Sequence, residues 1–402
     1  MPGGIYLHIP FCKSRCSYCD FATDVYKNAE AVERYVAALC GEIEAFDNAT
    51  VRTASVRERK ARYLQTPYIA EAKPPAYAGG SDIDTIYFGG GTPSLLSPKQ
   101  LERILDAVIS KFTVAPCSEV TLEMNPATVT TEKLRDYRSL GINRASFGVQ
   151  TFDNHALKLL ARGHDSADAR ATFKMLRDTG FDNISFDLIA GLPGQTLEAW
   201  ERNLDEAISM QPDHLSLYLL EIHEGTPLSL QVLSGRQPQP DPELAAEMYE
   251  TMLDRLAAAG YQQYEISNFS RPGFESRHNS KYWTLDPVFG FGVSAHSFDG
   301  RRRYANERDT ANYVEMIETR RSAEVMRENT DLASEFVFLG LRMENGIDLN
   351  EYGHRFGGDL IEKYDSELKD LLDAGLIETP FGGLRLTRKG KLFSNEVFAA
   401  FV

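Results

Sequence analysis

Three cysteines lie close together near the amino terminus of this chain. Cys12, Cys16 and Cys19 stand within eight residues and have the spacing C-x3-C-x2-C. They follow a short apolar run at residues 4–9 that is typical of a β-strand. Three thiolates on such a loop suit three irons of a [4Fe–4S] cube, because each iron takes one thiolate. No fourth cysteine follows closely, so the last iron would be open to a chelating small molecule.

Two other interpretations of this cluster are a structural zinc site and a chance grouping. Structural zinc sites favour four ligands in paired C-x2-C units, and a second pair is missing here. Chance is disfavoured by the further motifs described below. The two remaining cysteines, Cys40 and Cys117, are scattered, and we interpret them as packing or surface residues rather than ligands.

The composition narrows the class of protein. The chain has 402 residues, enough for two or three domains, and it is 43% apolar and 25% charged. No apolar stretch approaches the roughly 20 residues of a membrane span. The first residues lack a basic region followed by an apolar one, so a cytoplasmic location is expected. A net charge of −15 argues against nonspecific nucleic-acid binding, because a polyanion would be repelled.

Short β-type runs alternate with amphipathic helical segments up to about residue 260. The expected strands are residues 4–9, 84–88, 119–124, 144–149, 183–189 and 214–220, and the expected helices are 29–46, 98–112, 131–140, 165–179, 197–210 and 243–259. Six strand–helix units in a row predict a parallel sheet with crossover helices. We favour an α/β fold with a partial (β/α)6 barrel over an open doubly wound sheet. In either fold the site lies at the carboxyl ends of the strands.

The pattern predicts three regions. Residues 1–260 form the partial barrel, in which 48–82 break the alternation and are interpreted as a loop insertion. Residues 261–308 form a connecting region with a further strand at 261–267 and glycine- and aromatic-rich stretches. Residues 309–402 contain helices and then a hairpin around Gly382-Gly383, which predicts a smaller α+β domain that is winged-helix-like.

A glycine-rich turn follows the second expected strand. Gly89-Gly90-Gly91-Thr92-Pro93 would let a ligand touch the backbone closely, because glycine has no Cβ atom. A tight strand-to-helix turn is the alternative explanation. The cysteine motif upstream favours the ligand-binding interpretation.

Polar residues also stand at the ends of the next three expected strands. Glu123 ends the third strand, Gln150 ends the fourth and is followed by Arg162, and Asp187 lies near the end of the fifth. These side chains would point into one shared opening at the carboxyl ends of the strands, here called the mouth of the barrel. Arg162 is suited to bidentate pairing with a ligand carboxylate. For each residue alone, a helix cap or a structural ion pair is an equally good explanation.

Together, the stretch Tyr6-Leu7-His8-Ile9-Pro10-Phe11-Cys12, the cysteine loop, the Gly-Gly-Gly-Thr-Pro turn and the polar strand ends resemble the HemN/HemW branch of the radical S-adenosylmethionine (SAM) superfamily. The resemblance covers nearly the whole chain. It implies Cys12, Cys16 and Cys19 as ligands of a [4Fe–4S] cluster. It also implies contacts to cluster-bound SAM from Tyr6, Gly90 and Glu123, and contacts matching a second SAM from Tyr18, Gly91, Thr92, Gln150, Arg162 and Asp187.

Two features divide this branch. The coproporphyrinogen dehydrogenases carry a further cysteine two residues after the third, and this chain has Phe21 there. Second, His278-Asn279-Ser280-Lys281-Tyr282-Trp283 fits the H-N-x-x-Y-W signature of the HemW-type haem chaperones. The resemblance implies that His278 is an axial haem ligand and that Tyr282 and Trp283 pack on the porphyrin. A loop whose aromatic residues are simply buried is the alternative explanation.

The resemblance implies a haem chaperone that binds haem, a [4Fe–4S] cluster and SAM. It would pass haem to an acceptor protein, with a respiratory enzyme at the membrane as one candidate, and would act as a monomer or weak dimer. The alternative is an oxygen-independent coproporphyrinogen III dehydrogenase, against which Phe21 argues, so enzymatic activity is left open. A winged-helix nucleic-acid regulator with a redox-sensing cluster is a third hypothesis, and the acidic net charge weighs against it.

Overall fold

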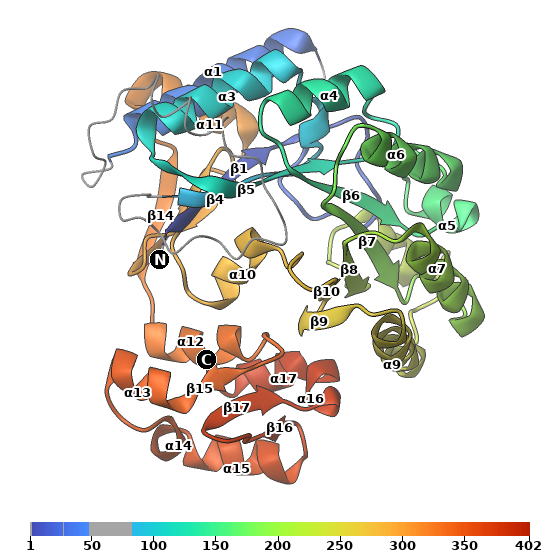
Figure 1. The fold of residues 1–402 in the computed structure, drawn as a ribbon, viewed down its shortest axis with the longest axis vertical. Coiled ribbons are helices and arrows are strands. Elements are labelled where there is room, and N and C mark those ends of the chain that lie inside the picture. The colour runs from blue at the N-terminus through green and yellow to red at the C-terminus, as the bar shows by residue number, and fades with distance from the viewer. Residues whose placement is uncertain (1, 27, 48–82) are drawn as a thin grey trace.

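The structure is a computed structural model that describes residues 2–26, 28–47 and 83–402. The loop insertion predicted at 48–82 lies outside the described residues. A single sheet organises most of the rest, and its centre is built from strands that run parallel to their neighbours (Figure 1). In spatial order these strands are β11 (Val288–Phe291), β1 (Gly3–Ile9), β4 (Ile83–Gly90), β5 (Val114–Met124), β6 (Arg144–Gln150), β7 (Ile184–Ala190) and β8 (His214–Leu219).

Helices alternate with the strands of this parallel sheet along the chain. They are α1 (Ala29–Ala45), α3 (Pro98–Lys111), α4 (Thr131–Ser139), α5 (Asn154–Leu159), α6 (Ser166–Asp178), α7 (Leu197–Met210), α8 (Pro227–Leu233) and α9 (Pro242–Ala258), and a short 3-10 turn, η1 (Pro93–Leu95), precedes α3. Figure 1 shows the strands curved into an arch with α1, α3, α4, α6 and α7 along its outside. The prediction of a partial α/β barrel is confirmed, because helices line one side of a curved and unclosed sheet.

The helix boundaries follow local signals. Helix α3 begins with a capping box between Ser97 and Gln100 and has Pro98 at its first position. Gly141, Gly180 and Gly260 follow α4, α6 and α9, and all three have positive φ angles of 92°, 84° and 83°. Glycine adopts this left-handed conformation without strain, which ends a helix cleanly. The core between sheet and helices is a single cluster of buried apolar side chains.

Antiparallel strands extend the parallel sheet on both sides, and the sequence did not predict this. On the β11 side lie β12 (His296–Phe298), β13 (Arg302–Asn306) and β14 (Glu324–Asn329), with helix α11 (Thr310–Arg320) between the last two. On the β8 side lie β10 (Asn268–Ser270) and β9 (Gln262–Glu265). The strand expected at 261–267 is therefore one arm of a tight hairpin.

A short helix occupies the inner side of the arch. The residues of the H-N-x-x-Y-W motif form α10 (Arg277–Trp283), which contacts β1 and β4 and also the first helix of the carboxyl-terminal region, α12 (Leu332–Gly340). Figure 1 shows α10 between the arch and that region. The aromatic residues of the motif are thus on a helix and not in a loop.

The carboxyl-terminal region has its own apolar core. Its further elements are β15 (Ile347–Asp348), α13 (Leu349–Phe356), α14 (Leu360–Lys363), α15 (Asp365–Asp373), β16 (Ile377–Glu378), β17 (Gly383–Leu386), α16 (Arg388–Leu392) and α17 (Ser394–Ala399). The predicted hairpin is β16–β17, and β15 adds a third strand. The smaller α+β domain is therefore confirmed. Across the described part of the chain, no helix combines the length and apolar character needed to cross a membrane.

Candidate functional site

The cysteine loop begins where β1 ends. A two-residue strand, β2 (Phe11–Cys12), pairs in parallel with β3 (Asp24–Val25), so the chain between them must form a closed loop. The N–H of Tyr26 donates to the carbonyl of Cys12 at 2.8 Å and closes its base. Cys12, Cys16 and Cys19 are all partly buried, and none forms a disulfide. The loop therefore keeps three free thiols together at the carboxyl end of β1.

Ser17 fixes this loop to the rest of the molecule. Its N–H donates to the Leu160 carbonyl at 3.0 Å, and its hydroxyl donates to the Leu159 carbonyl at 3.0 Å. Its own carbonyl accepts the N–H of Leu228 at 2.8 Å. Leu159 is the last residue of α5 and Leu228 is the second residue of α8, so the loop is attached to helices that follow β6 and β8 along the chain. The position of Ser17, between Cys16 and Cys19, thus depends on segments more than 140 residues away in the chain.

A chain of polar side chains connects two of the cysteines. The hydroxyl of Thr92 donates to Cys12 Sγ at 3.6 Å and accepts Asn125 Nδ2 at 2.8 Å. Asn125 Oδ1 accepts Arg162 Nη2 at 2.5 Å, and Arg162 Nη1 donates to Cys16 Sγ at 3.4 Å. Two donors therefore point at thiol sulfurs, where they would stabilise the negative charge of thiolates. Sequence reasoning missed Asn125, although it stands only two residues after Glu123.

These thiols suit an iron–sulfur cluster chemically. Burial raises the pKa of Cys12 to about 11, and burial also raises the pKa of Cys19. The thiols of Cys12 and Cys19 therefore favour the protonated form, and iron would have to displace those protons on binding. In the described ranges, no three His, Cys, Asp or Glu side chains are grouped as they would be around a single metal ion. Three cysteines with donors aimed at their sulfurs fit the ligand set of a [4Fe–4S] cluster.

The glycine turn packs tightly against the cysteine loop. A Cβ atom on Gly91 would lie 2.7 Å from the carbonyl of Pro10, and one on Gly90 would lie 2.7 Å from the ring of His8. The N–H of Gly91 donates to the Ile9 carbonyl at 2.8 Å, and that of Thr92 donates to the Phe11 carbonyl at 2.8 Å. The glycines are therefore needed to bring the end of β4 against the start of the loop.

Glu123 lies at the carboxyl end of β5, beside this turn. One carboxylate oxygen accepts the hydroxyl of Tyr87 at 2.8 Å, and the other accepts the N–H of Gly90 at 3.1 Å. Burial raises the pKa of Glu123 to about 7, against the two hydrogen bonds. The side chain is still partly exposed. A fixed and partly accessible carboxylate suits an amine or a ribose hydroxyl as its ligand.

The remaining residues predicted to contact SAM belong to the same mouth. Arg162 Nη1 lies 3.4 Å from the hydroxyl of Tyr18, and its Nη2 donates to the Gly148 carbonyl at 2.7 Å. Gln150 ends β6 with a φ angle of 67°, a left-handed conformation that is costly for a side chain other than glycine. Asp187 in β7 has a pKa raised to about 6 by burial. All of them are partly exposed.

Tyr6 lies beside the residues that hold Glu123. It is partly buried in β1, and its hydroxyl is hydrogen-bonded to His8 Nδ1 at 3.0 Å. Its ring stacks on Tyr87 with centroids 6.1 Å apart, and Tyr87 in turn holds Glu123. The structure thus brings Tyr6, Gly90 and Glu123 together. Tyr87 is a second residue that sequence reasoning missed. It stands two residues before Gly89 in β4, so the two residues share one face of the strand.

The residues predicted to contact haem lie on α10, on the inner side of the arch (Figure 1). His278 is near the amino ends of the strands, where its Nδ1 is hydrogen-bonded to Thr85 Oγ1 at 2.9 Å and its Nε2 to the Tyr282 hydroxyl at 3.1 Å. The imidazole is only 1% exposed. Tyr282 and Trp283 are partly exposed, and the guanidinium of Arg342 lies over the Trp283 ring at 4.3 Å. His278 therefore uses both ring nitrogens within the protein.

Known protein families and a solved structure are similar to this chain. The family model of the radical SAM superfamily matches residues 6–207, and the HemN C-terminal domain model matches residues 328–393. The structure is similar to that of coproporphyrinogen III oxidase (HemN) from Escherichia coli, with a TM-score of 0.80 at 23% identity, covering 100% of this chain and 90% of that one. At this identity the likeness shows the fold alone.

Curated relatives match over almost the full length. The chain is 36% identical to "Heme chaperone HemW" of Bacillus subtilis, covering 99% of this chain and 98% of the relative. It is 32% identical to the protein of that name from Escherichia coli, covering 100% of this chain and 98% of the relative. It is also 33% identical to the mitochondrial "Radical S-adenosyl methionine domain-containing protein 1" of Mus musculus, covering 96% and 84%. This chain therefore belongs to the HemW family within the radical SAM superfamily.

Proposed function

We propose that this protein is a haem chaperone that binds haem, a [4Fe–4S] cluster and SAM, and that hands haem to an acceptor protein in the cytoplasm or at the membrane surface. The observation that carries the proposal is the full-length similarity to proteins named as haem chaperones, which includes both the barrel and the carboxyl-terminal domain. A respiratory enzyme as the acceptor and a monomer or weak dimer as the active form remain predictions.

The residues have separate roles in this proposal. Cys12, Cys16 and Cys19 hold the cluster, and Tyr6, Gly90 and Glu123 orient SAM beside it. Tyr18, Gly91, Thr92, Gln150, Arg162 and Asp187 complete the mouth. A bound cluster of this type supplies one electron to the SAM sulfonium, while the protein supplies position and electrostatics. Thr92 and Arg162 support this role, because both donate to cysteine sulfurs.

The haem site is proposed at α10. Tyr282 and Trp283 are partly exposed and offer aromatic surface to a porphyrin. A haem iron that bound His278 Nε2 would have to displace the Tyr282 hydroxyl, which lies 3.1 Å from that nitrogen. Axial ligation by His278 therefore requires a local rearrangement of α10 and remains a prediction.

Anaerobic haem titration of the reconstituted full-length protein tests the proposal. We expect one haem per chain, with an absorbance spectrum that changes in His278→Ala if the imidazole is the ligand. Transfer is then measured by adding a haem-free acceptor and following the loss of the chaperone-bound spectrum. Absence of haem binding would overturn the chaperone assignment.

The alternative function is an oxygen-independent coproporphyrinogen III dehydrogenase. The fold is shared with such an enzyme, but Phe21 stands where the further cysteine would be, and its side chain is 68% exposed. The same preparation is therefore incubated with coproporphyrinogen, SAM and a reductant. Formation of vinyl-bearing product without haem binding would favour the enzyme.

A further inference from the structure

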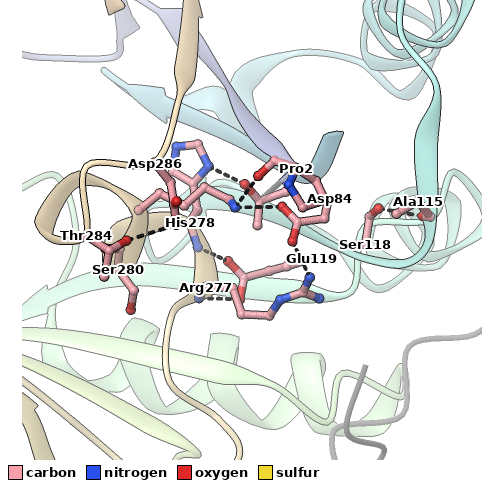
Figure 2. Close-up of polar contacts among 12 residues, drawn as sticks. Pro2, Asp84, Ala115, Ser118, Glu119, Arg277, His278, Ser280, Thr284 and Asp286 are labelled. Atoms are coloured by element: carbon pink, nitrogen blue, oxygen red, sulfur yellow. Dashed lines mark hydrogen bonds and ion pairs between the residues drawn. The ribbon is translucent and has the colours of Figure 1, made fainter. Parts of the chain in front are cut away.

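Helix α10 is anchored by a buried network of charges. The carboxylate of Glu119 accepts the backbone N–H groups of Arg277 and His278, both at 3.0 Å. Asp84 pairs with Arg277 at 2.9 Å and with Lys281 at 2.8 Å, and Lys281 Nζ also donates to the Pro2 carbonyl at 2.8 Å. Figure 2 shows His278 and Arg277 facing Glu119 and Asp84 within this network. The helix is therefore fixed against the amino end of β4 and the middle of β5.

This anchoring holds His278 inside the arch. Gly4 makes room for the ring, because a Cβ atom there would lie 3.1 Å from the imidazole and 2.7 Å from Thr85 Oγ1. Burial lowers the pKa of His278 to about 3, and Lys281 lowers it further. The imidazole is thus neutral, with one nitrogen donating and the other accepting. Its partners, Thr85 and Tyr282, fix the ring in one orientation.

The imidazole in turn supports the ring of Tyr87. The two rings are stacked, with centroids 5.0 Å apart and an interplanar angle of 27°. Tyr6 stacks on Tyr87 at 6.1 Å and lies 6.5 Å from the ring of His278. The hydroxyl of Tyr87 donates to Glu123 at 2.8 Å. One ring and one hydrogen bond therefore separate His278 from the carboxylate at the mouth.

We propose that His278 is a positioning residue for the SAM site, which holds Tyr87, and through it the carboxylate of Glu123, in the orientation that receives the amine or ribose of SAM. The inference rests on the proposed binding of SAM. It gives the histidine of the H-N-x-x-Y-W motif a role that does not involve contact with haem. The spacing of the motif suits this role, because His278 and Tyr282 stand one helical turn apart and face the same side of α10.

The test is SAM binding by equilibrium dialysis to the full-length protein with its cluster reconstituted. His278→Ala is expected to raise the SAM dissociation constant about tenfold, the equivalent of one well-placed hydrogen bond. Iron and sulfide content and the electron paramagnetic resonance (EPR) spectrum of the reduced cluster without SAM should stay unchanged. Thr284→Ala, an exposed change just after α10, is the matched control and should bind SAM like the wild type.

Two conservative variants distinguish a loss of positioning from a folding defect. Tyr87→Phe keeps the stacked ring and removes only the hydroxyl that holds Glu123, and Tyr282→Phe removes only the partner of His278 Nε2. Both should weaken SAM binding. If His278 acts through Tyr87, the double variant His278→Ala/Tyr87→Phe should raise the SAM dissociation constant by less than the product of the two single fold-changes. This non-additivity would not arise from unrelated structural damage.

The outcomes separate this inference from the proposed function. If the wild type binds SAM and His278→Ala binds it equally well, the positioning role is wrong while the chaperone proposal stands. The positioning role would also be overturned if the fold-changes in SAM dissociation constant from His278→Ala and Tyr87→Phe simply multiplied in the double variant. If the wild type binds haem but no SAM, the SAM component of the proposed function is lost and this inference falls with it. A haem spectrum altered in His278→Ala with unchanged SAM affinity would assign the histidine to haem.

Discussion

Arg162 Nη1 lies 3.4 Å from Cys16 Sγ, so a cationic donor points at one of the three thiols. A donor of this kind stabilises the added negative charge when a bound cluster is reduced, and it therefore raises the reduction potential. Arg162→Gln should lower the potential by about 60 mV, the one-electron equivalent of about 1.4 kcal/mol. An EPR-monitored redox titration measures the shift.

Lys13→Gln is the control for this prediction. Lys13 is on the same loop, but it is exposed and its ammonium donates to the Ala127 carbonyl. Solvent and salt screen such a charge, so its removal should move the potential less. Equal shifts in both variants would show that overall charge matters and that the hydrogen bond to Cys16 does not.

Removing one of the three thiols should abolish the cluster. Cys16→Ser leaves the loop held by Ser17 but removes the ligand that Arg162 contacts. Iron and sulfide are then measured per chain after anaerobic reconstitution, with Cys40→Ser as the control outside the loop. A full complement of iron and sulfide in Cys16→Ser would refute the assignment of the ligands.

Glu123 should make the protein without its cofactors less stable as the pH rises. Its pKa is raised from 4.5 to about 7 by burial, so the folded state favours the neutral acid. Stability is fully present below pH 4.5 and is lost as the pH rises through 7. At pH 8 we expect Glu123→Gln to be more stable than the wild type by on the order of 1–2 kcal/mol, because partial exposure reduces the effect.

Urea unfolding of both proteins at pH 4.5 and pH 8 checks this sign. Other buried carboxylates, such as Asp187 and Glu42, also have raised pKa values, so the wild type alone cannot isolate Glu123. The difference between wild type and Glu123→Gln should be small at the lower pH and grow toward the higher one. A constant difference would mean that Glu123 does not titrate in this range.

Gly4→Ala tests the packing of α10 against β1. The new methyl group would lie 2.7 Å from Thr85 Oγ1 and 3.1 Å from the ring of His278, so one of them must move. We expect a loss of about 1–3 kcal/mol in the free energy of unfolding. Gly163→Ala is the control, because a methyl group there meets nothing closer than 3.8 Å. Equal stabilities of the two variants would contradict the close fit of α10.

The parts of the site that could be predicted from the sequence are those whose position depends on a neighbouring strand in the chain. The cysteines, the glycine turn and Glu123 all stand at or just after the carboxyl end of a strand, and the carboxyl ends of parallel strands meet at one edge of the sheet. The placement of α10 could not be predicted in this way. Its anchors, Asp84 and Glu119, are far away in the chain, and nothing near His278 indicates that its N–H meets a carboxylate of β5.

The antiparallel extensions were missed for a related reason. β14 reads Glu-Val-Met-Arg-Glu-Asn and is mostly exposed, so it lacks the apolar run by which the central strands were found. Such a strand is specified by pairing with β13 and not by its own composition. The strand expected at 261–267 covers only β9 and the turn after it, and β10 was missed, because that turn carries no glycine or proline.

The first strand of the chain pairs on one side with a strand from far along the sequence, and this has a consequence for synthesis. β1 pairs with β4 on one side and with β11, near residue 288, on the other. The carbonyl of Ser17 accepts the N–H of Leu228, which is also far along the chain. The cysteines leave the ribosome early, but the segments that enclose them follow much later. Contacts so distant in sequence form slowly. A growing chain therefore lacks the β11 and α8 contacts of this segment until more than half of it has been synthesised.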